Sequence, residues 1–259
     1  MPVKVRGLLD LPGEQRASLV EHAMLCARAS ALAYAAGARL SESATTAGFA
    51  LTAELPRRTN FGAIFDRPGL RIVAFRGTDE AGDWLTSLNI LWRKSPWGPV
   101  HRGFWDAACS FQPEVEQAVA EARTAGQRVW VTGHSLGGAI AVMTAARLAA
   151  IDPTLVDGLC TFGQPPVAGM FFGRKCTEIL GDRYLRIVNH TDAVVEASTL
   201  MAAHCGWLWY FDADGRLYHK RPFKVGITDQ WKANRNLGGL YMFEAHGLEG
   251  YLQPLSKLV

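Results

Sequence analysis

A serine between two glycines is the first feature of the chain that could carry chemistry. Residues 129–138 run Val-Trp-Val-Thr-Gly-His-Ser-Leu-Gly-Gly, so an apolar, strand-like stretch ends in a Gly-x-Ser-x-Gly turn, and a helical stretch of small residues follows. This pattern is typical of a nucleophile elbow, which holds the serine hydroxyl at the carboxyl end of a sheet. Gly133 and Gly137 leave room where strand and helix pass on either side of Ser135. A glycine-rich turn capped by a serine is the alternative, but it does not explain two glycines at this spacing.

The serine needs an acid and a base downstream. A serine hydroxyl is a poor nucleophile unless a base removes its proton, and a carboxylate must hold that base in one tautomer. After an elbow serine these partners come in the order serine, acid, histidine. Among the downstream acids, Asp192 alone sits a few residues beyond a predicted core strand, 184–189. On position alone, a turn aspartate that follows a strand is the alternative.

Four histidines follow the serine, and two of them remain candidates for the base. His219 falls in a predicted hairpin, and His190 lies too near Asp192 in sequence to face it easily across a loop. His246 lies in a loop beyond the last predicted strand, between two small residues, where an imidazole can reach back to the serine. This placement favours His246 over His204, which stays open as the alternative.

The tetrahedral intermediate of such a reaction needs two hydrogen-bond donors for its oxyanion. The backbone N–H of Leu136, directly after the serine, is the expected first donor. Thr78, in the loop after the predicted strand 70–75, is the candidate for the second, although this loop could also be a simple strand-exit turn. His134, beside the serine, is expected to be directed away by the turn and to pack or hydrogen-bond elsewhere.

The elements that must position these residues alternate between strands and helices. Predicted helices cover 14–36, 106–125, 139–150 and a segment after 246, and predicted strands cover 49–54, 60–65, 70–75, 128–132, 156–162, 184–189, 207–211 and 216–219. This order predicts an α/β fold with a mainly parallel central sheet and helices on both faces. Ligand sites in such sheets lie outside the carboxyl ends of the strands. The absence of linkers and repeats predicts one domain over 1–259.

Composition narrows the function classes. The chain has 259 residues, of which 49% are hydrophobic and 20% charged, with a formal net charge of +3. That charge is too small to favour nucleic acid as a partner. Five scattered cysteines indicate reduced core thiols and no zinc motif. The most apolar window, 19–36, carries three charged or titratable residues, which argues against a transmembrane segment, and the lack of a signal-peptide pattern predicts a cytoplasmic protein.

Several motifs together resemble those of the class 3 (fungal-type) lipases of the α/β-hydrolase fold. The resemblance extends over roughly residues 60 to 250. It is carried by Ala-Phe-Arg-Gly-Thr at 74–78, Val-His-Arg-Gly-Phe at 100–104, the elbow at 132–138, Thr-Phe-Gly-Gln-Pro at 161–165, and the segments 186–192 and 245–251. The resemblance assigns the acid to Asp192, favours His246 as the base, and matches Thr78 to the family's first oxyanion residue.

The resemblance also implies an activity. It implies a serine carboxylester hydrolase, a lipase for triacylglycerols or other acylglycerols, that works through an acyl-enzyme without a cofactor or a metal. An ester lipid would be its partner, with transient contact to a lipid interface. The alternatives are a phospholipase, a feruloyl esterase or a short-chain carboxylesterase with the same machinery, or a non-catalytic binding protein on a hydrolase scaffold.

The segment after the oxyanion loop contains four of the eight tryptophans, between residues 84 and 105. A core helix and its connection is one interpretation of this apolar stretch. The family resemblance instead places a short lid here, which would cover apolar surface in water and open at a lipid interface. The candidate lid and substrate-binding residues are Trp84, Leu85, Leu88 and Trp92, with Arg93 and Lys94 as a basic flank.

Overall fold

A mostly parallel sheet of eight strands, in the order β1-β2-β3-β6-β7-β8-β9-β10, organises the described part of the chain. The computed structural model describes residues 13–35, 37–77, 91–196, 203–219 and 245–258. The strands of the sheet are β1 (Ala50–Pro56), β2 (Phe61–Arg67), β3 (Leu70–Phe75), β6 (Arg128–His134), β7 (Gly158–Phe162), β8 (Tyr184–Asn189), β9 (Trp207–Phe211) and β10 (Leu217–Tyr218).

The centre of the sheet is parallel and its two edges are antiparallel. β3, β6, β7, β8 and β9 pair in parallel, so the carboxyl ends of these five strands lie on the same side of the molecule. β1 and β2 join β3 through antiparallel pairs, and β10 pairs antiparallel with β9. A parallel pair needs a long crossover, which helices supply here, whereas a tight turn with Gly69 at φ 71° suffices between β2 and β3. The predicted α/β fold is therefore confirmed.

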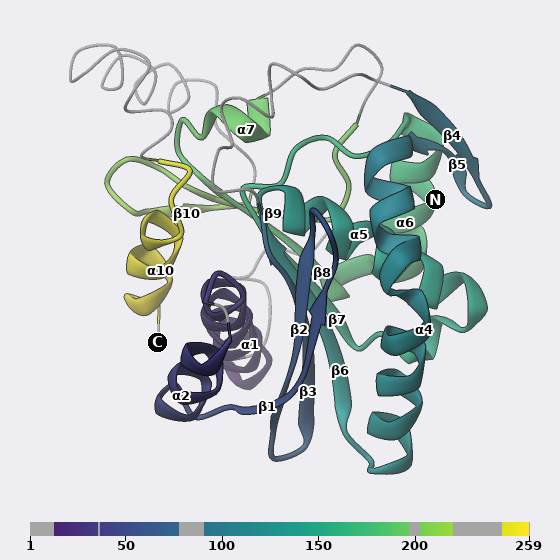
Figure 1. The fold of residues 1–259 in the computed structure, drawn as a ribbon. Coiled ribbons are helices and arrows are strands. Elements are labelled where there is room, and N and C mark those ends of the chain that lie inside the picture. Colours follow the sequence, from purple (N-terminus) through teal and green to yellow (C-terminus); the bar gives the residue numbers. More distant parts are fainter. Residues whose placement is uncertain (1–12, 36, 78–90, 197–202, 220–244, 259) are drawn as a thin grey trace.

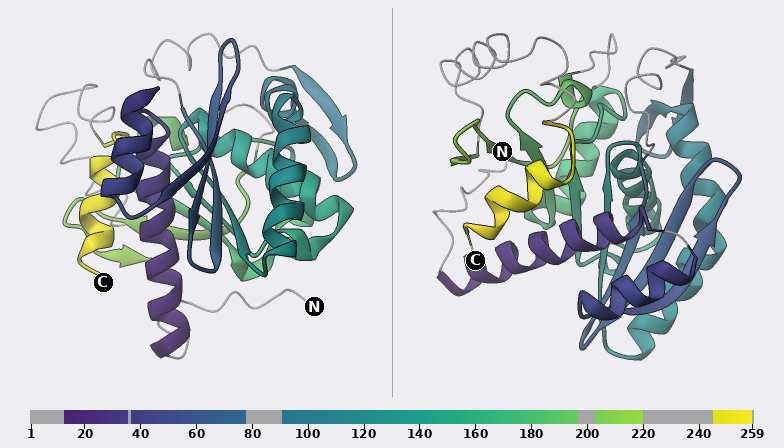
Figure 2. Two further views of the ribbon diagram at one scale, coloured as in Figure 1. Left: turned by 60° about the horizontal axis from the view of Figure 1, so that its bottom comes forward. Right: turned by 60° about the vertical axis from the view of Figure 1, so that its left-hand side comes forward.

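Helices cover both faces of the sheet (Figures 1 and 2). One face carries α1 (Gly13–Leu32), α2 (Ala38–Thr46) and α10 (Glu249–Ser256), and the other carries α4 (Arg102–Thr124), α5 (Leu136–Ile151) and α6 (Met170–Leu180). Two separate hydrophobic clusters result, one on each face. α5 is apolar around nearly its whole circumference because it is buried between the sheet and its neighbours. None of the described helices is long and apolar enough to cross a membrane.

Smaller elements complete the described part. β4 (Trp92–Ser95) and β5 (Gly98–His101) form a separate two-stranded sheet, and α7 (Ala193–Glu196) follows β8. Two 3-10 turns, η2 (Pro153–Leu155) and η3 (Gly181–Arg183), precede β7 and β8. The five cysteines are free thiols, and all but Cys109 are buried, in agreement with the predicted core thiols.

The structure corrects several predicted element boundaries. β3, β8 and β9 have their predicted limits, but α1 ends at Leu32 instead of 36, and α4 begins at Arg102 instead of 106. α2 and the β4–β5 pair were not predicted. α2 is rich in serine and threonine and buries only Leu40 and Ala44 in the core, so its amphipathic pattern depends on two apolar residues in a short helix.

Candidate active site

Ser135 lies at the sharp turn between β6 and α5. Its backbone has φ 56° and ψ −128°, a conformation that non-glycine residues rarely adopt and that costs roughly 1–3 kcal/mol. The flanking glycines are required by close contacts. A Cβ on Gly137 would lie 2.1 Å from the carbonyl oxygen of Phe75, and a Cβ on Gly133 would lie 2.3 Å from the backbone of Gly137. The predicted elbow is therefore present, with the serine at the carboxyl end of β6.

Asp192 follows β8 and is completely buried. One of its oxygens accepts a hydrogen bond from the backbone N–H of Val194 at 2.9 Å. The other accepts one from the hydroxyl of Tyr251, and both lie within 3.0 Å of Nδ1 of His246. These donors compensate the burial of the carboxylate. Asp192 therefore contacts the imidazole of His246, and its role as the catalytic acid stays a prediction.

His246 is oriented by this contact. Because the carboxylate can only accept, Nδ1 of His246 carries the proton and Nε2 carries the lone pair of the neutral ring. Within the described residues, buried Nε2 has no hydrogen-bond partner, and the same holds for Oγ of Ser135. A base with a free lone pair and a hydroxyl with a free proton are the two groups that general-base activation of a serine requires.

The backbone of His246 is held by a second histidine. Nε2 of His134 donates to the carbonyl oxygen of His246 at 2.6 Å, and the two rings lie 4.5 Å apart. The hydroxyl of Tyr34, in turn, donates to Nδ1 of His134 at 2.8 Å. Burial, reinforced by the nearby His246, lowers the pKa of His134 to about 3, so this ring is neutral. His134 packs and hydrogen-bonds as predicted, but it does so directly against the candidate base.

Three further residues shape the site and were missed by sequence reasoning. Gly163 has φ 56°, and a Cβ there would lie 2.6 Å from Asp192 Oδ2 and 3.0 Å from His246 Nδ1. Asn189, the last residue of β8, donates to the carbonyl oxygen of Ala245 at 3.0 Å and so ties the histidine loop to the sheet. Tyr251 is the third. Gly163 was visible as part of the Thr-Phe-Gly-Gln-Pro motif, but nothing local marked its contact with Asp192.

The other histidine and acid candidates have different surroundings. His204 is mostly buried, its Nε2 donates to the carbonyl oxygen of Val195 at 3.0 Å, and burial lowers its pKa to about 4. His219 packs against Trp207. Asp212 accepts hydrogen bonds from two backbone N–H groups of its own hairpin turn, which explains the Asp-x-Asp-Gly sequence. Within the described residues, no group of three or more His, Cys, Asp or Glu side chains could hold a metal ion.

The predicted oxyanion and lid residues are only partly described. Leu136 is the first residue of α5, so its backbone N–H lies at the positive end of the helix dipole. Thr78, Trp84, Leu85 and Leu88 lie outside the described residues. Trp92 begins β4, where it pairs with His101, and its side chain is 37% exposed. It is thus a strand residue and not part of a core helix.

Comparison with known proteins identifies the family of the chain. The family model "Lipase (class 3)" matches residues 72–201, about half of the chain. A secreted mono- and diacylglycerol lipase of Fusarium solani is 33% identical over 145 residues, which cover 53% of this chain and 43% of the relative. A triacylglycerol lipase of Arabidopsis thaliana is 26% identical over 257 residues, or 73% of this chain and 49% of the relative. Plant phospholipases A1 are further relatives.

A solved structure supports the fold. Lipase II of Rhizopus niveus superimposes with a TM-score of 0.65 at 21% identity, over 75% of this chain and 81% of the fungal one. The sheet, the elbow and this likeness define an α/β-hydrolase. With the family match, the chain belongs to the class 3 lipases. It spans less than half the length of either curated lipase compared above.

Proposed function

We propose that the protein hydrolyses carboxylic esters of lipids, acylglycerols in the first place, through Ser135, His246 and Asp192. The observation that carries this proposal is the orientation of His246. Asp192 fixes its Nδ1–H, and neither its Nε2 nor the hydroxyl of the elbow serine has a hydrogen-bond partner among the described residues. A non-catalytic scaffold would have no reason to retain a strained serine and two unsatisfied buried atoms, each of which costs roughly 1–3 kcal/mol.

The proposed reaction has two halves. Nε2 of His246 takes the proton of Ser135 while Oγ bonds to the ester carbonyl carbon, and the carbonyl π electrons move to its oxygen. When the tetrahedral intermediate collapses, the bond to the alcohol oxygen breaks, and His246 returns the proton to that oxygen. Water then attacks the acyl-enzyme in the same way, with His246 as base, and releases the carboxylic acid. Asp192 stabilises the imidazolium in both halves.

The backbone N–H of Leu136 is proposed to donate to the oxyanion, with Thr78 as the second donor. A donor at the first residue of a helix needs no reorganisation during the reaction, because the helix fixes its direction. Removal of one oxyanion donor typically costs roughly 100- to 1,000-fold in kcat.

A lipid substrate is supported by apolar side chains at the start of β4. Leu91 is 53% exposed and Trp92 is 37% exposed, and the basic side chains of Arg93 and Lys94 are exposed beside them. Aromatic and aliphatic side chains with basic neighbours bind the surface of anionic lipid layers. We propose that this segment contacts the lipid interface and that Trp84, Leu85, Leu88 and Trp92 form a lid over the substrate.

The test is a substrate panel with the purified protein. We expect hydrolysis of p-nitrophenyl esters and of emulsified acylglycerols, with faster turnover of medium and long acyl chains. Ser135→Ala should lose nearly all of it, by roughly four orders of magnitude or more, without loss of folding. A phospholipase A1 activity, which the plant relatives favour as a second candidate, would appear instead as fatty acid release from phosphatidylcholine. Absence of any ester hydrolysis would refute the catalytic proposal.

A further inference from the structure

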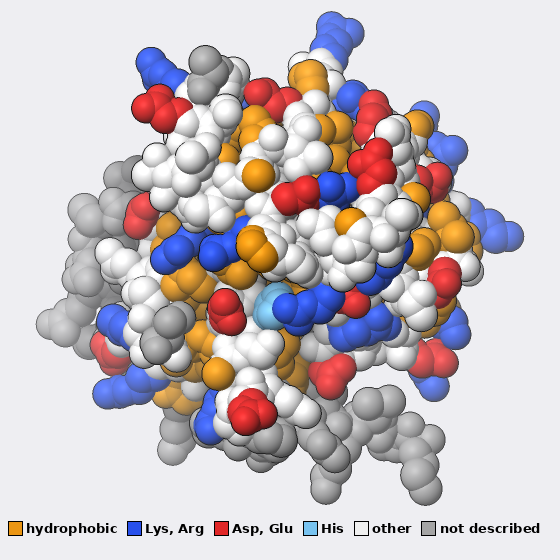
Figure 3. All heavy atoms as spheres, turned by 90° about the horizontal axis from the view of Figure 1, so that it is seen from below, with side chains coloured by type: hydrophobic (Ala, Val, Ile, Leu, Met, Phe, Trp, Pro, Cys, Tyr) orange, Lys and Arg blue, Asp and Glu red, His pale blue; other side chains and the backbone are white. Residues whose placement is uncertain are grey.

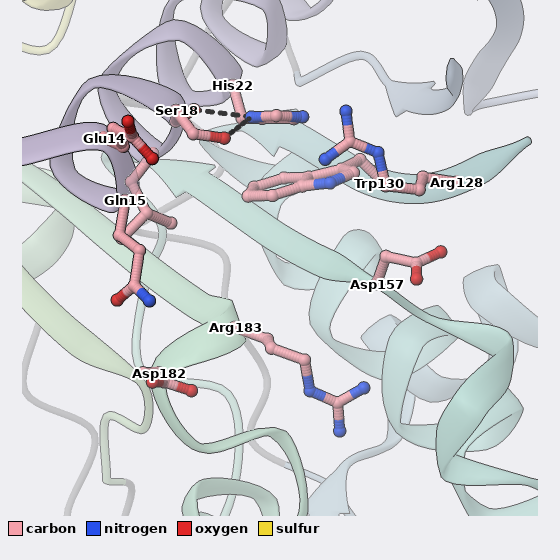
Figure 4. A pocket seen from close by; sticks show the side chains of 10 residues that line it. Glu14, Gln15, Ser18, His22, Arg128, Trp130, Asp157, Asp182 and Arg183 are labelled. Carbon is pink, nitrogen blue, oxygen red and sulfur yellow. Dashed lines mark hydrogen bonds between the residues drawn. The ribbon is translucent and has the colours of Figure 1, made fainter. Parts of the chain in front are cut away.

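A cavity of about 470 Å³ lies at the amino-terminal end of the parallel strands, opposite the elbow (Figures 3 and 4). Its walls come from the first turns of α1, the start of β6 and the segments that lead into β7 and β8. Trp130 of β6 lines it, and four residues lie between Trp130 and Ser135, which places the two Cα atoms roughly 17 Å apart along the strand. The volume falls within the range of about 300–1,000 Å³ that is typical of small-molecule sites.

The floor of the cavity is made of flat and apolar side chains. The imidazole of His22 stacks on Trp130 with ring centroids 4.7 Å apart and an interplanar angle of 21°. His22 is 4% exposed, and its Nδ1 donates to the carbonyl oxygen of Ser18. Burial lowers the pKa of His22, so the neutral ring presents a lone pair on Nε2. Nε2 has no hydrogen-bond partner among the described residues, and Figure 4 shows it directed along the cavity wall toward Arg128.

The rim carries three charges that are not neutralised. Glu14 and Asp182 lie on one side of the cavity and Arg128 on the other (Figure 4). All three side chains belong to exposed residues. In the part of the chain that the structure describes, none of them forms an ion pair or a side-chain hydrogen bond. Opposite charges therefore face each other across the cavity without contact.

The remaining charged groups of the wall are already engaged. The guanidinium of Arg183 donates to three backbone carbonyl oxygens, including that of Val156 at 2.6 Å. Asp157 pairs with Arg123 at 2.7 Å and accepts the backbone N–H of Val129. These contacts fix the wall, because each group is held by partners from a different segment. The groups left over for a ligand are two separate carboxylates on one side, one guanidinium and one imidazole lone pair.

We propose that this cavity binds a small zwitterion, a molecule with an ammonium group and a carboxylate or phosphate group on a short apolar body. The ammonium group would lie on the acidic side of the cavity, which carries Glu14 and Asp182, the anionic group would lie against Arg128, and the apolar body over Trp130. His22 Nε2 would accept an N–H or O–H of the ligand. A simple anion would face two carboxylates, a simple cation would face the guanidinium, and a hydrocarbon would desolvate all three charges without compensation.

Titration calorimetry on the full chain tests this with matched ligands. Leucine and phenylalanine supply an ammonium and a carboxylate, and glycerophosphocholine supplies a quaternary ammonium and a phosphate. 4-Methylpentanoate and 3-methylbutylamine each lack one of the charges of leucine. We expect at least one zwitterion to bind roughly tenfold or more tightly than either singly charged analogue. Comparing the affinity for the two amino acids with that for glycerophosphocholine shows whether the site prefers a carboxylate or a phosphate.

Variants locate the binding. Arg128→Gln and Glu14→Gln should each weaken binding of that zwitterion by roughly 10- to 100-fold, because each removes a charged partner. Gln15→Trp, on the exposed first turn of α1, should abolish binding by filling the cavity. Arg58→Gln and Glu42→Gln remove exposed charges elsewhere and should leave the affinity within about twofold. Ester hydrolysis should be unchanged in all five variants, since none of these residues touches the active site.

Two results would overturn the proposal. One is that no zwitterion binds, or that the singly charged analogues bind as tightly. The other is that Arg128→Gln and Gln15→Trp, both folded as judged by circular dichroism, bind as tightly as the parent protein, which would place the ligand elsewhere. Neither result bears on ester hydrolysis, so the two proposals succeed or fail independently.

Discussion

Strand β6 connects two ends of the molecule that differ in the burial and hydrogen bonding of their polar groups. At its carboxyl end the polar groups are buried and nearly all satisfied: Asp192 accepts from three residues, and both ring nitrogens of His134 are hydrogen-bonded. At its amino end, Glu14 and Arg128 are exposed and unpaired among the described residues. The first arrangement fixes geometry for a reaction, and the second leaves charge free for association.

The contrast shows how to interpret a polar atom that lacks a partner. Burying such an atom without compensation costs roughly 1–3 kcal/mol, whereas an exposed charge is solvated by water and costs little. The unpartnered Nε2 of His246 differs from other unpartnered buried atoms, such as Nε1 of Trp209, because Asp192 and His134 hold His246 in one orientation. The unpaired charges at the other end gain meaning only through the cavity that they surround.

The largest expected effect separates the two downstream histidines. His246→Ala should be as inactive as Ser135→Ala, a loss of roughly four orders of magnitude or more, because the triad acts as a unit. His204→Ala should keep most of its activity, since His204 bonds to Val195 and not to Asp192. Initial rates on p-nitrophenyl butyrate measure both. The opposite ranking of the two variants would show that the base is His204.

A pair of glycines tests how closely the site is packed. Gly163 and Gly126 both have positive φ angles, 56° and 68°, so alanine strains the backbone at both positions, by at least roughly 1–2 kcal/mol. Only at Gly163 would the new Cβ meet Asp192 and His246, whereas nothing lies within 4 Å at Gly126. Gly163→Ala should therefore lose roughly 100-fold or more in kcat, and Gly126→Ala should lose only stability. Equal kcat values in the two variants would contradict the packing argument.

The elbow and the sheet were predictable from the sequence because their signals are local. The strand, the two glycines and the following helix lie within about twenty residues of Ser135, and β8, which precedes Asp192, is a mostly apolar segment with one arginine, Arg186, inside it. The choice between His246 and His204 needed the family resemblance, because Asp192 meets a histidine 54 residues further along the chain. No local pattern encodes that approach.

Other parts of the site could not be predicted for the same reason. Tyr34 reaches His134 across 100 residues of sequence, and Gly163 is needed only because three side chains from other elements converge on it. The amino-end cavity is assembled from four separate segments, each of which is unremarkable alone. The short helix α2 was missed because its apolar face consists of only two buried residues, Leu40 and Ala44.

Acid should destabilise the protein through its buried histidines. The folded-state pKa values of His134 and His204 are about 3 and about 4, below the ordinary value of 6.5. At a pH between the folded-state and the ordinary pKa, the unfolded chain binds more protons than the folded one. The free energy of unfolding therefore falls as the pH drops from about 6.5 toward 4. His204→Gln, which keeps a donor for Val195, should show a shallower fall in Tm over this range. Parallel curves for variant and parent would exclude His204 as a contributor.

The smallest expected effect concerns the hydrogen bonds that position His246 from behind. Tyr34→Phe removes the donor to Nδ1 of His134, and His134 in turn holds the carbonyl of His246. Because a single hydrogen bond contributes a net of about 0.5–1.5 kcal/mol, kcat should fall roughly two- to tenfold with little change in KM. Tyr218→Phe removes a comparable hydroxyl bond, to Asp212, in the hairpin of the β9 and β10 strands, and it should leave kcat unchanged.

If both variants retain the parent kcat, the contact of Tyr34 is structural only. A fall in kcat confined to Tyr34→Phe would make Tyr34 a positioning residue, one that acts through His134 on the base without touching the substrate.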